Sequence, residues 1–196
     1  MDLSLIVVAS TNRHKYEELV KLFSKTNISL LFGGDIEEGF VVDETEDTYE
    51  KNALLKARAW AQQTGMPAIA DDSGIEILAL DGAPGVLSAR AAPGNDEDRV
   101  RWLLDKMEGA ADRSARFVAC IVLALPNEDV YYAATGMCTG TIALSPSGSA
   151  GFGYDPVFIP DGYTETLADL GEAVKSKKSH RAIAARKMAQ IISSML

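Results

Sequence analysis

The chain has 196 residues, of which 47% are hydrophobic and 24% charged, and this composition is typical of a globular protein. Its formal net charge of −9 argues against partners such as nucleic acid or an anionic membrane surface. Two cysteines, Cys120 and Cys138, are too few for a disulfide scaffold, and no Cys/His spacing indicates zinc. No apolar run is long enough for a signal peptide or a membrane span, so we expect a cytoplasmic protein.

The first segment predicts a buried strand over Leu3–Val8, a polar turn, and a helix over Tyr16–Ser24. The positive end of the helix dipole and the side chain of Lys15 would favour a phosphate in this turn. The turn lacks the glycines of a Walker or Rossmann loop. From the pattern alone, a capped helix start with solvated basic residues is the simpler explanation.

A second strand is predicted over Ser29–Phe32, followed by an acidic segment, Asp35–Asp47, that we expect to be mostly a solvated loop. A helix then runs from about Thr48 to Thr64 and ends at Gly65. Lys56 on this helix could reach a cleft, although a surface lysine is the default interpretation.

Two adjacent carboxylates, Asp71 and Asp72, follow a short apolar run that predicts a strand over Ala68–Ala70. At the carboxyl end of a strand they would point to opposite sides, one of them toward a cleft. Gly74 would then allow a sharp exit. An ordinary junction between a strand and a turn accounts for the pattern equally well.

The middle of the chain predicts a strand over Ile75–Leu80, a Gly/Pro-rich loop, and a helix over Asp96–Met107 capped by Asn95. Long β-prone runs at Ala115–Leu125 and Val130–Thr139 indicate an antiparallel hairpin. We expect this hairpin to form a second lobe, with a groove between the lobes.

The glycine-rich stretch Gly148–Pro156 carries two aromatic residues, Phe152 and Tyr154, on what we expect to be an open loop. A flat ligand could lie between such rings, and close backbone approach requires glycine. A glycine hairpin whose aromatics fill the core is an equal alternative.

The last helix is predicted over about Ser179–Met195, after Lys175, Lys177 and Lys178. A basic cluster at a helix N-terminus is opposite to what the helix dipole favours, so it indicates an anionic or carbonyl-rich ligand. A solvated basic turn is the simpler alternative.

Taken together and in order, these segments closely resemble the inosine triphosphate pyrophosphatase family, also called Ham1-like. The resemblance covers essentially the full length. It departs at Ala150, where a glycine is usual, and at Val174 and Lys178, where an acidic and an aliphatic residue are usual. It is carried by the following blocks: Ala9–Asn12 with Lys15, Glu44, Asn52–Ala57, Ala70–Gly74, Gly85 with Ser88–Arg90, Gly151–Pro156, and Lys175 with Ser179–Arg181.

The resemblance implies an α/β fold: one ITPase-like domain over residues 1–196 with an elongated mixed β-sheet flanked by helices, two lobes and a central cleft. It implies hydrolysis of the deaminated purine nucleotides ITP, dITP and XTP to the monophosphate and pyrophosphate, which cleanses the nucleotide pool. Members are commonly homodimers.

The implied mechanism uses Mg²⁺ held by Glu44 and Asp72, with Asp72 also acting as the catalytic base toward water. Asp71 would support Asp72 or a neighbouring water, and the sequence leaves this division open. Phe152 would stack on the purine, and a donor at its edge would select the 6-oxygen of hypoxanthine or xanthine. The implied substrate-binding residues are Ser10, Thr11, Asn12, Arg13, His14, Lys15, Lys56, Ser73, Phe152, Gly153, Tyr154, Asp155, Lys175, His180 and Arg181.

Two alternatives use the same residues. A Mg²⁺-dependent nuclease or phosphomonoesterase would release different products. A nucleotide-binding regulatory protein would bind without catalysis.

Overall fold

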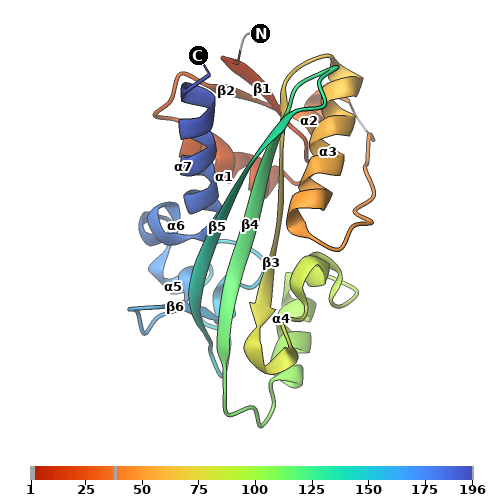
Figure 1. The fold of residues 1–196 in the computed structure, drawn as a ribbon. Coiled ribbons are helices and arrows are strands. Elements are labelled where there is room, and N and C mark those ends of the chain that lie inside the picture. The colour runs from red at the N-terminus through yellow and green to blue at the C-terminus, as the bar shows by residue number, and fades with distance from the viewer. Residues whose placement is uncertain (1–2, 38, 196) are drawn as a thin grey trace. The chain divides into compact units, whose positions relative to one another are not determined.

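The computed structural model describes residues 3–37 and 39–195. Its six strands form a mixed sheet in the order β2-β1-β3-β4-β5-β6, and the expected α/β class is confirmed (Figure 1). β1 runs parallel to both β2 and β3, whereas β5 and β6 are antiparallel. The strands are β1 Leu5–Val8, β2 Ser29–Phe32, β3 Ala68–Ile77, β4 Ser114–Ala124, β5 Tyr131–Ile142 and β6 Phe158–Pro160.

Seven α-helices and three short 3-10 helices join the strands along the described residues. No helix in residues 3–37 and 39–195 is long and apolar enough to cross a membrane. The helices are α1 Arg13–Phe23, α2 Gly33–Ile36, α3 Tyr49–Thr64, α4 Asp96–Lys106, α5 Leu167–Leu170, α6 Glu172–Lys178, α7 His180–Ser193, η1 Leu78–Leu80, η2 Gly85–Arg90 and η3 Asp155–Val157.

The chain divides into two compact units, in keeping with the two lobes expected from the sequence. The first comprises the described residues of Met1–Asp72, Ala119–Gly136 and Arg181–Leu196, and the second Ser73–Val118 and Met137–His180. The expected role of the hairpin is wrong in one respect. Each of its long strands contributes residues to both units, so the hairpin is not a lobe of its own.

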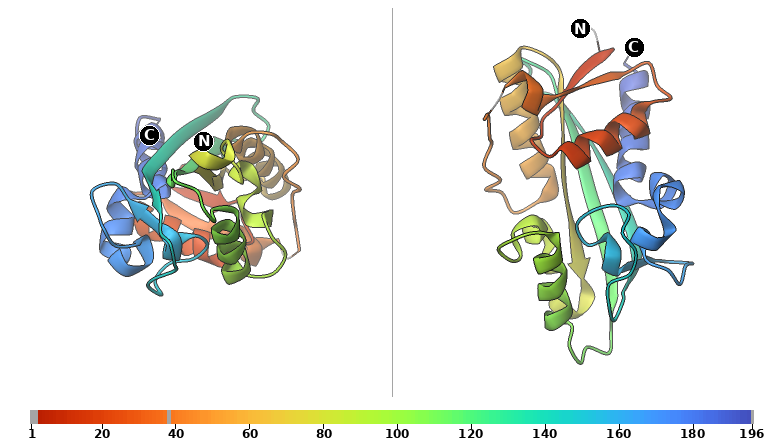
Figure 2. Two further views of the ribbon diagram at one scale, coloured as in Figure 1. Left: turned by 90° about the horizontal axis from the view of Figure 1, so that it is seen from below. Right: turned by 180° about the vertical axis from the view of Figure 1, so that it is seen from behind.

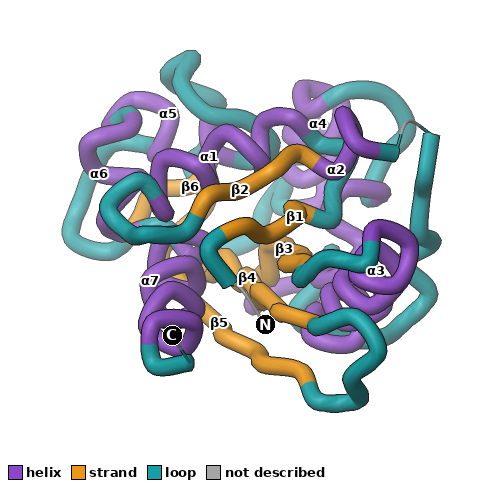
Figure 3. The backbone as a smooth tube through the Cα atoms, turned by 90° about the horizontal axis from the view of Figure 1, so that it is seen from above, coloured by secondary structure: helices purple, strands orange, loops and turns teal. Residues whose placement is uncertain are grey.

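In the first unit, helices cover both faces of the sheet (Figures 2 and 3). Leu19 and Phe23 of α1 and Met188 of α7 pack against one face, which includes Ile6 and Ile69. On the other face, the buried side of α3 packs against alternate strand residues, including Val7, Ala68 and Ala70. Strand side chains alternate, so each strand of this buried sheet supplies apolar residues to both layers.

In the second unit, α4 packs on the ends of the long strands. Val100, Leu103 and Met107 of this helix join Ile75, Phe117 and other buried residues in a separate core. Asn95 and Asp98 form a capping box at the start of α4, as the Asn–Asp spacing favours.

The strand predicted to end at Ala70 continues without a break to Ile77, so the expected turn at Asp71–Gly74 is wrong. Gly74 is needed for close approach and not for a sharp exit. A Cβ at this position would overlap the carbonyl oxygen of Gly85 and the hydroxyl of Ser88.

Candidate active site

Asp71 and Asp72 lie inside β3, where both are almost fully buried, with relative exposures of 4% and 3%. Asp71 is two residues beyond Ile69 and continues the face covered by α1 and α7. Asp72 is two residues beyond Ala70 and continues the face covered by α3. The predicted alternation of the two carboxylates is therefore present, although it arises inside a strand and not at its end.

On its face, Asp71 meets two cations. Its Oδ2 lies 2.9 Å from Nζ of Lys15 and 3.1 Å from Nη2 of Arg181. Arg181 in turn places Nη1 2.6 Å from Oε2 of Glu18. Burial alone would raise the pKa of Asp71, but the charges of Arg181 and Lys15 outweigh it and hold this pKa well below its usual range. Burial would likewise lower the pKa of Arg181, and Asp71 and Glu18 reverse this, so its pKa is raised.

On the other face of the strand, Asp72 has a longer contact with a cation than Asp71 has. Its Oδ1 lies 3.7 Å from Nζ of Lys56, and the same amino group forms a close ion pair with Glu44 and donates to the Asp71 carbonyl at 3.0 Å. Oδ2 of Asp72 is buried and has no hydrogen-bond partner among the described residues. Burial raises the pKa of Asp72 to about 6; Lys56 opposes this shift and Glu44 adds to it.

The surroundings of Asp72 fit a divalent cation bound in part by the protein. Asp72 and Glu44 both approach the ammonium group of Lys56, and within the described part of the chain a buried carboxylate oxygen of Asp72 has no hydrogen-bond partner. Within residues 3–37 and 39–195, no three His, Cys, Asp or Glu side chains gather as a metal site. Two carboxylates completed by water and phosphate oxygens are a coordination set typical of Mg²⁺.

The polar turn between β1 and α1 combines local capping with one cation aimed at the carboxylates. Asn12 caps α1 by accepting the Lys15 N–H at 3.2 Å, and Ser10 Oγ accepts the Asn12 N–H at 3.0 Å. The helix begins at Arg13, three residues earlier than predicted, because of this cap. Arg13 pairs with Asp35 at 2.8 Å and lies over the ring of Phe32. Thr11 and His14 are exposed.

In the second unit, the segment Gly151–Asp155 (the Phe152 loop) is folded by its own polar groups. The Phe152 N–H donates to Oδ2 of Asp155 at 3.0 Å, and that oxygen also lies 2.7 Å from Nζ of Lys175. The Lys175 ammonium is 4.5 Å from the centre of the Phe152 ring, a cation–π distance. Tyr154 is buried, and its hydroxyl donates to the Ser88 carbonyl at 2.9 Å. The two aromatics therefore differ: Tyr154 anchors the loop, and Phe152 is only half-buried.

The predicted basic cluster precedes the last helix, α7, as expected, but it belongs to a separate helix that the sequence analysis missed. Lys175, Lys177 and Lys178 form the last turn of α6, where the helix dipole favours positive charge. Ser179 separates α6 from α7, which begins at His180. His180 is buried and stacks on Phe117, with the ring centres 4.6 Å apart.

A model of the Ham1 family matches residues 6–191 of this chain. The chain belongs to the Ham1 family. It is 46% identical over 193 residues to a dITP/XTP pyrophosphatase of Rhodospirillum centenum, which covers 93% of this chain and 92% of that protein. It is 39% identical over 198 residues to a dITP/XTP pyrophosphatase of Aquifex aeolicus, with 95% and 96% covered.

Solved Ham1 structures have the same fold. The Ham1 protein from Coxiella burnetii is 36% identical and superposes with a TM-score of 0.88, over 97% of this chain and 98% of that one. The Staphylococcus aureus Ham1 protein is 34% identical with a TM-score of 0.87, over 98% and 100%.

Apart from the turn residues Ser10, Thr11, Asn12, Arg13 and His14, which lie in the first unit, the predicted site residues of this Ham1 protein fall into two groups. Lys15, Glu44, Lys56, Asp71, Asp72 and Arg181 meet in the first unit and, together with Glu18, are termed the carboxylate cluster. Phe152, Gly153, Tyr154, Asp155, Lys175, His180 and Ser73 lie in the second. The sequence analysis missed Glu18, although it lies one helical turn after Lys15, a spacing that places both on one face of α1.

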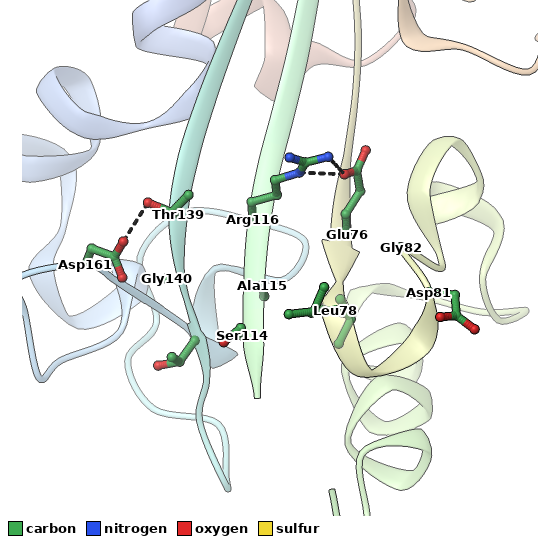
Figure 4. A pocket seen from close by; sticks show the side chains of 12 residues that line it. Glu76, Leu78, Asp81, Gly82, Ser114, Ala115, Arg116, Thr139, Gly140 and Asp161 are labelled. Atoms are coloured by element: carbon green, nitrogen blue, oxygen red, sulfur yellow. Dashed lines mark hydrogen bonds and ion pairs between the residues drawn. The ribbon is translucent and has the colours of Figure 1, made fainter. Parts of the chain in front are cut away.

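A further cavity of about 530 Å³ lies in the second unit, lined by residues of β3, β4 and β5 (Figure 4). Its polar groups largely satisfy one another. Arg116 pairs with Glu76 at 2.6 Å, and the Thr139 hydroxyl donates to Asp161 at 2.6 Å. None of the predicted site residues lines it, and we do not assign the substrate to it.

Proposed function

We propose that this protein hydrolyses the deaminated purine nucleotides dITP, XTP and ITP to the nucleoside monophosphate and pyrophosphate. One water is added across the α–β phosphoanhydride in each turnover. The observation that carries the proposal is the buried Asp72. Its Oδ1 lies 3.7 Å from Lys56 and its Oδ2 has no hydrogen-bond partner among the described residues, in a member of a family whose relatives bear the name dITP/XTP pyrophosphatase.

The proton acceptor in this proposal is Asp72. A general base works best when its pKa lies near the operating pH, and burial raises the pKa of Asp72 to about 6. Oδ2, which has no partner among the described residues, is the atom that takes the proton from water. Asp71 is not suited to this role because two cations already hold its carboxylate.

Charge at the phosphates is offset by the lysines of the carboxylate cluster, Lys15 and Lys56, and by the N-terminus of α1. Glu44 and Asp72 would hold Mg²⁺, which when bound supplies further positive charge at the phosphate oxygens. The turn residues Ser10, Thr11 and Asn12 would lie along the phosphates and orient them.

The purine is assigned to the Phe152 loop, where the half-buried ring of Phe152 would stack on the base. His180, Lys175 and backbone N–H groups are candidates for the base edge. A donor facing purine position 6 accepts the oxo group of hypoxanthine or xanthine and opposes the amino group of adenine, which can discriminate by about 10⁴-fold. Arg181 is reassigned from the base edge to support of Asp71, because both of its terminal nitrogens contact carboxylates.

Product analysis with purified protein, Mg²⁺ and a nucleotide panel tests the proposal. We expect pyrophosphate release from dITP, XTP and ITP, and kcat/KM for dATP lower by at least about 10²-fold. Orthophosphate as the product would indicate a phosphomonoesterase. Nucleotide binding without any release would indicate a regulatory protein, and either result would overturn the proposal.

The resemblance implies a homodimer, and the lack of a long apolar run in the sequence led to the expectation of a cytoplasmic protein; both stay predictions. Size-exclusion chromatography with light scattering would test the first. Fractionation of cells that express a tagged chain would test the second.

A further inference from the structure

The first residue of α4, Asp96, is not needed to cap its own helix. Asn95 accepts the Asp98 N–H at 3.1 Å, and Asp98 accepts the Asn95 N–H at 3.0 Å. This reciprocal pair satisfies the helix start. The Asp96 carboxylate can therefore form hydrogen bonds outside the start of α4.

That carboxylate holds the Phe152 loop. Oδ2 of Asp96 accepts the Gly153 N–H at 2.7 Å, and Oδ1 forms a close ion pair with Arg99. Arg99 is itself fixed by donating to the Gly94 carbonyl at 3.1 Å. An ionised acceptor makes the bond to Gly153 stronger than an ordinary amide hydrogen bond.

The two backbone N–H groups on either side of the Phe152 side chain thus both donate to carboxylates. Asp155 accepts the N–H that precedes the ring, and Asp96 accepts the one that follows it. Next to this contact lies a cavity of about 520 Å³, lined by Asp96 and Gly153, by apolar residues of α4 and the facing loop, and by the charged residues Glu97, Arg101 and Asp105. Because these two hydrogen bonds fix the peptide groups on either side of the ring, we expect them to decide where the Phe152 ring lies.

We propose that Asp96 is a positioning residue for substrate recognition, which sets the placement of Phe152 through the Gly153 N–H. The proposal rests on the proposed function insofar as Phe152 contacts the purine. Asp96 itself need not touch the nucleotide. Loss of the hydrogen bond between Asp96 and the Gly153 N–H is then expected to weaken binding of the base and to leave binding of the phosphates unchanged.

Three variants separate this role from a general loss of stability. Asp96→Ala removes the acceptor, and Asp96→Asn keeps an oxygen that can accept the Gly153 N–H. Arg99→Gln removes the ion pair but leaves the Asp96 carboxylate. In Asp96→Ala we expect KM for dITP to rise about tenfold with kcat within twofold, because a charge-assisted hydrogen bond is lost. Asp96→Asn and Arg99→Gln should stay within threefold of the wild type.

Two further measurements make the result decisive. Competitive inhibition by inorganic pyrophosphate, which has no base, should be unchanged in Asp96→Ala. Amide hydrogen exchange at Gly153 should be about tenfold faster in Asp96→Ala and near the wild-type rate in Asp96→Asn. The exchange measurement needs no substrate, so it stands even if the wild-type protein releases no pyrophosphate.

Unchanged exchange at Gly153 in Asp96→Ala would overturn the proposal. So would faster exchange with an unaltered KM, because the loop would then be held by Asp96 without a part in recognition. Equal losses toward dITP and pyrophosphate would show a merely structural role. Absence of turnover in the wild-type protein, with the exchange result as expected, would instead overturn the proposed function.

Discussion

Asp71 and Asp72 are neighbours in sequence and equally buried, yet the two faces of β3 give them opposite surroundings. On the face of α1 and α7, Asp71 receives both Lys15 and Arg181. On the face of α3, Oδ1 of Asp72 lies 3.7 Å from Nζ of Lys56, and the same ammonium pairs more closely with Glu44. The pKa of Asp71 is held low and that of Asp72 is raised to about 6.

The difference shows that burial alone does not determine what a carboxylate can do. Desolvation is the largest influence on both groups. Close contact with two cations reverses it for Asp71, whereas Asp72 has longer contacts with cations and two neighbouring carboxylates, Glu44 and Asp71, that raise its pKa further. A carboxylate paired with two cations, such as Asp71, is a poor proton acceptor but can hold the side chains of those cations in place. An under-paired one such as Asp72 is suited to accept a proton or a metal ion. We therefore propose that the packing divides the roles that the sequence left open, with Asp72 as the proton acceptor and Asp71 as an ion-pair partner.

The strongest test of this division exchanges each carboxylate for its amide. Asp72→Asn should lower kcat by at least about 10³-fold, since it removes the proposed base and one metal oxygen. Nucleotide binding should survive in this variant, and calorimetry with dITP can measure it. The measurement is pyrophosphate release under saturating substrate.

Asp71→Asn is the matched control, one residue away in the same strand. We expect it to lose stability and to keep kcat within about tenfold of the wild type, because Asp71 is proposed as an ion-pair partner. A reversed ranking, with Asp72→Asn active and Asp71→Asn inactive, would exchange the two assignments.

The second prediction concerns the ion pairs that Arg181 forms with Asp71 and Glu18. Arg181→Gln leaves Asp71 and Glu18 buried without their shared guanidinium, and should lower the free energy of unfolding by about 3 kcal/mol. Urea denaturation measures this change. Arg186→Gln, an exposed change on the same helix, should cost less than about 0.5 kcal/mol. Equal effects of the two variants would mean that the ion pairs of Arg181 stabilise the fold no more than an exposed arginine does.

Much of the fold could be predicted because local patterns and tertiary packing agree. The apolar, β-prone runs and the Asn95 cap place most elements within a few residues, whereas the Asn12 cap was missed and α1 begins three residues earlier than predicted. The prediction failed at Asp71–Gly74, where turn-forming residues lie in a continuous strand. There the local preference for a turn is overridden by the close packing of Gly74 against Gly85 and Ser88.

The site was less predictable because its pairings are long-range. The resemblance singled out Lys15 and Arg181, but not that both would meet at Asp71, 110 residues from Arg181 in sequence. The helix α6 was missed because its seven residues are mostly charged, which hides the periodicity of a buried face. Asp96 looked like an ordinary helix-start acid, and its contact with Gly153 spans 57 residues.

The third prediction uses the titration of Asp72 in metal-free protein. Its pKa of about 6 in the folded state lies above the ordinary value of about 3.9 in the unfolded chain. A raised pKa stabilises the fold at low pH, and that contribution is lost as pH rises from about 4 through about 6. The stability advantage of Asp72→Asn over the wild type should therefore grow across this range, by about 2 kcal/mol. Urea midpoints of both proteins in EDTA measure it, and a difference independent of pH would contradict the raised pKa.

The smallest effect is expected from Glu18→Gln, which tests whether the stabilisation by Arg181 depends on one carboxylate or two. Glu18 is the outer partner of Arg181, with 13% of its side chain exposed against 2% for Asp71. A glutamine can still accept from Nη1, so we expect a loss of only about 1 kcal/mol in the free energy of unfolding and an unchanged kcat. If kcat falls more than tenfold while stability is kept, Arg181 must be oriented by Glu18 for a part in turnover. The contrast between an ion-paired face and a reactive face of β3 would then no longer hold.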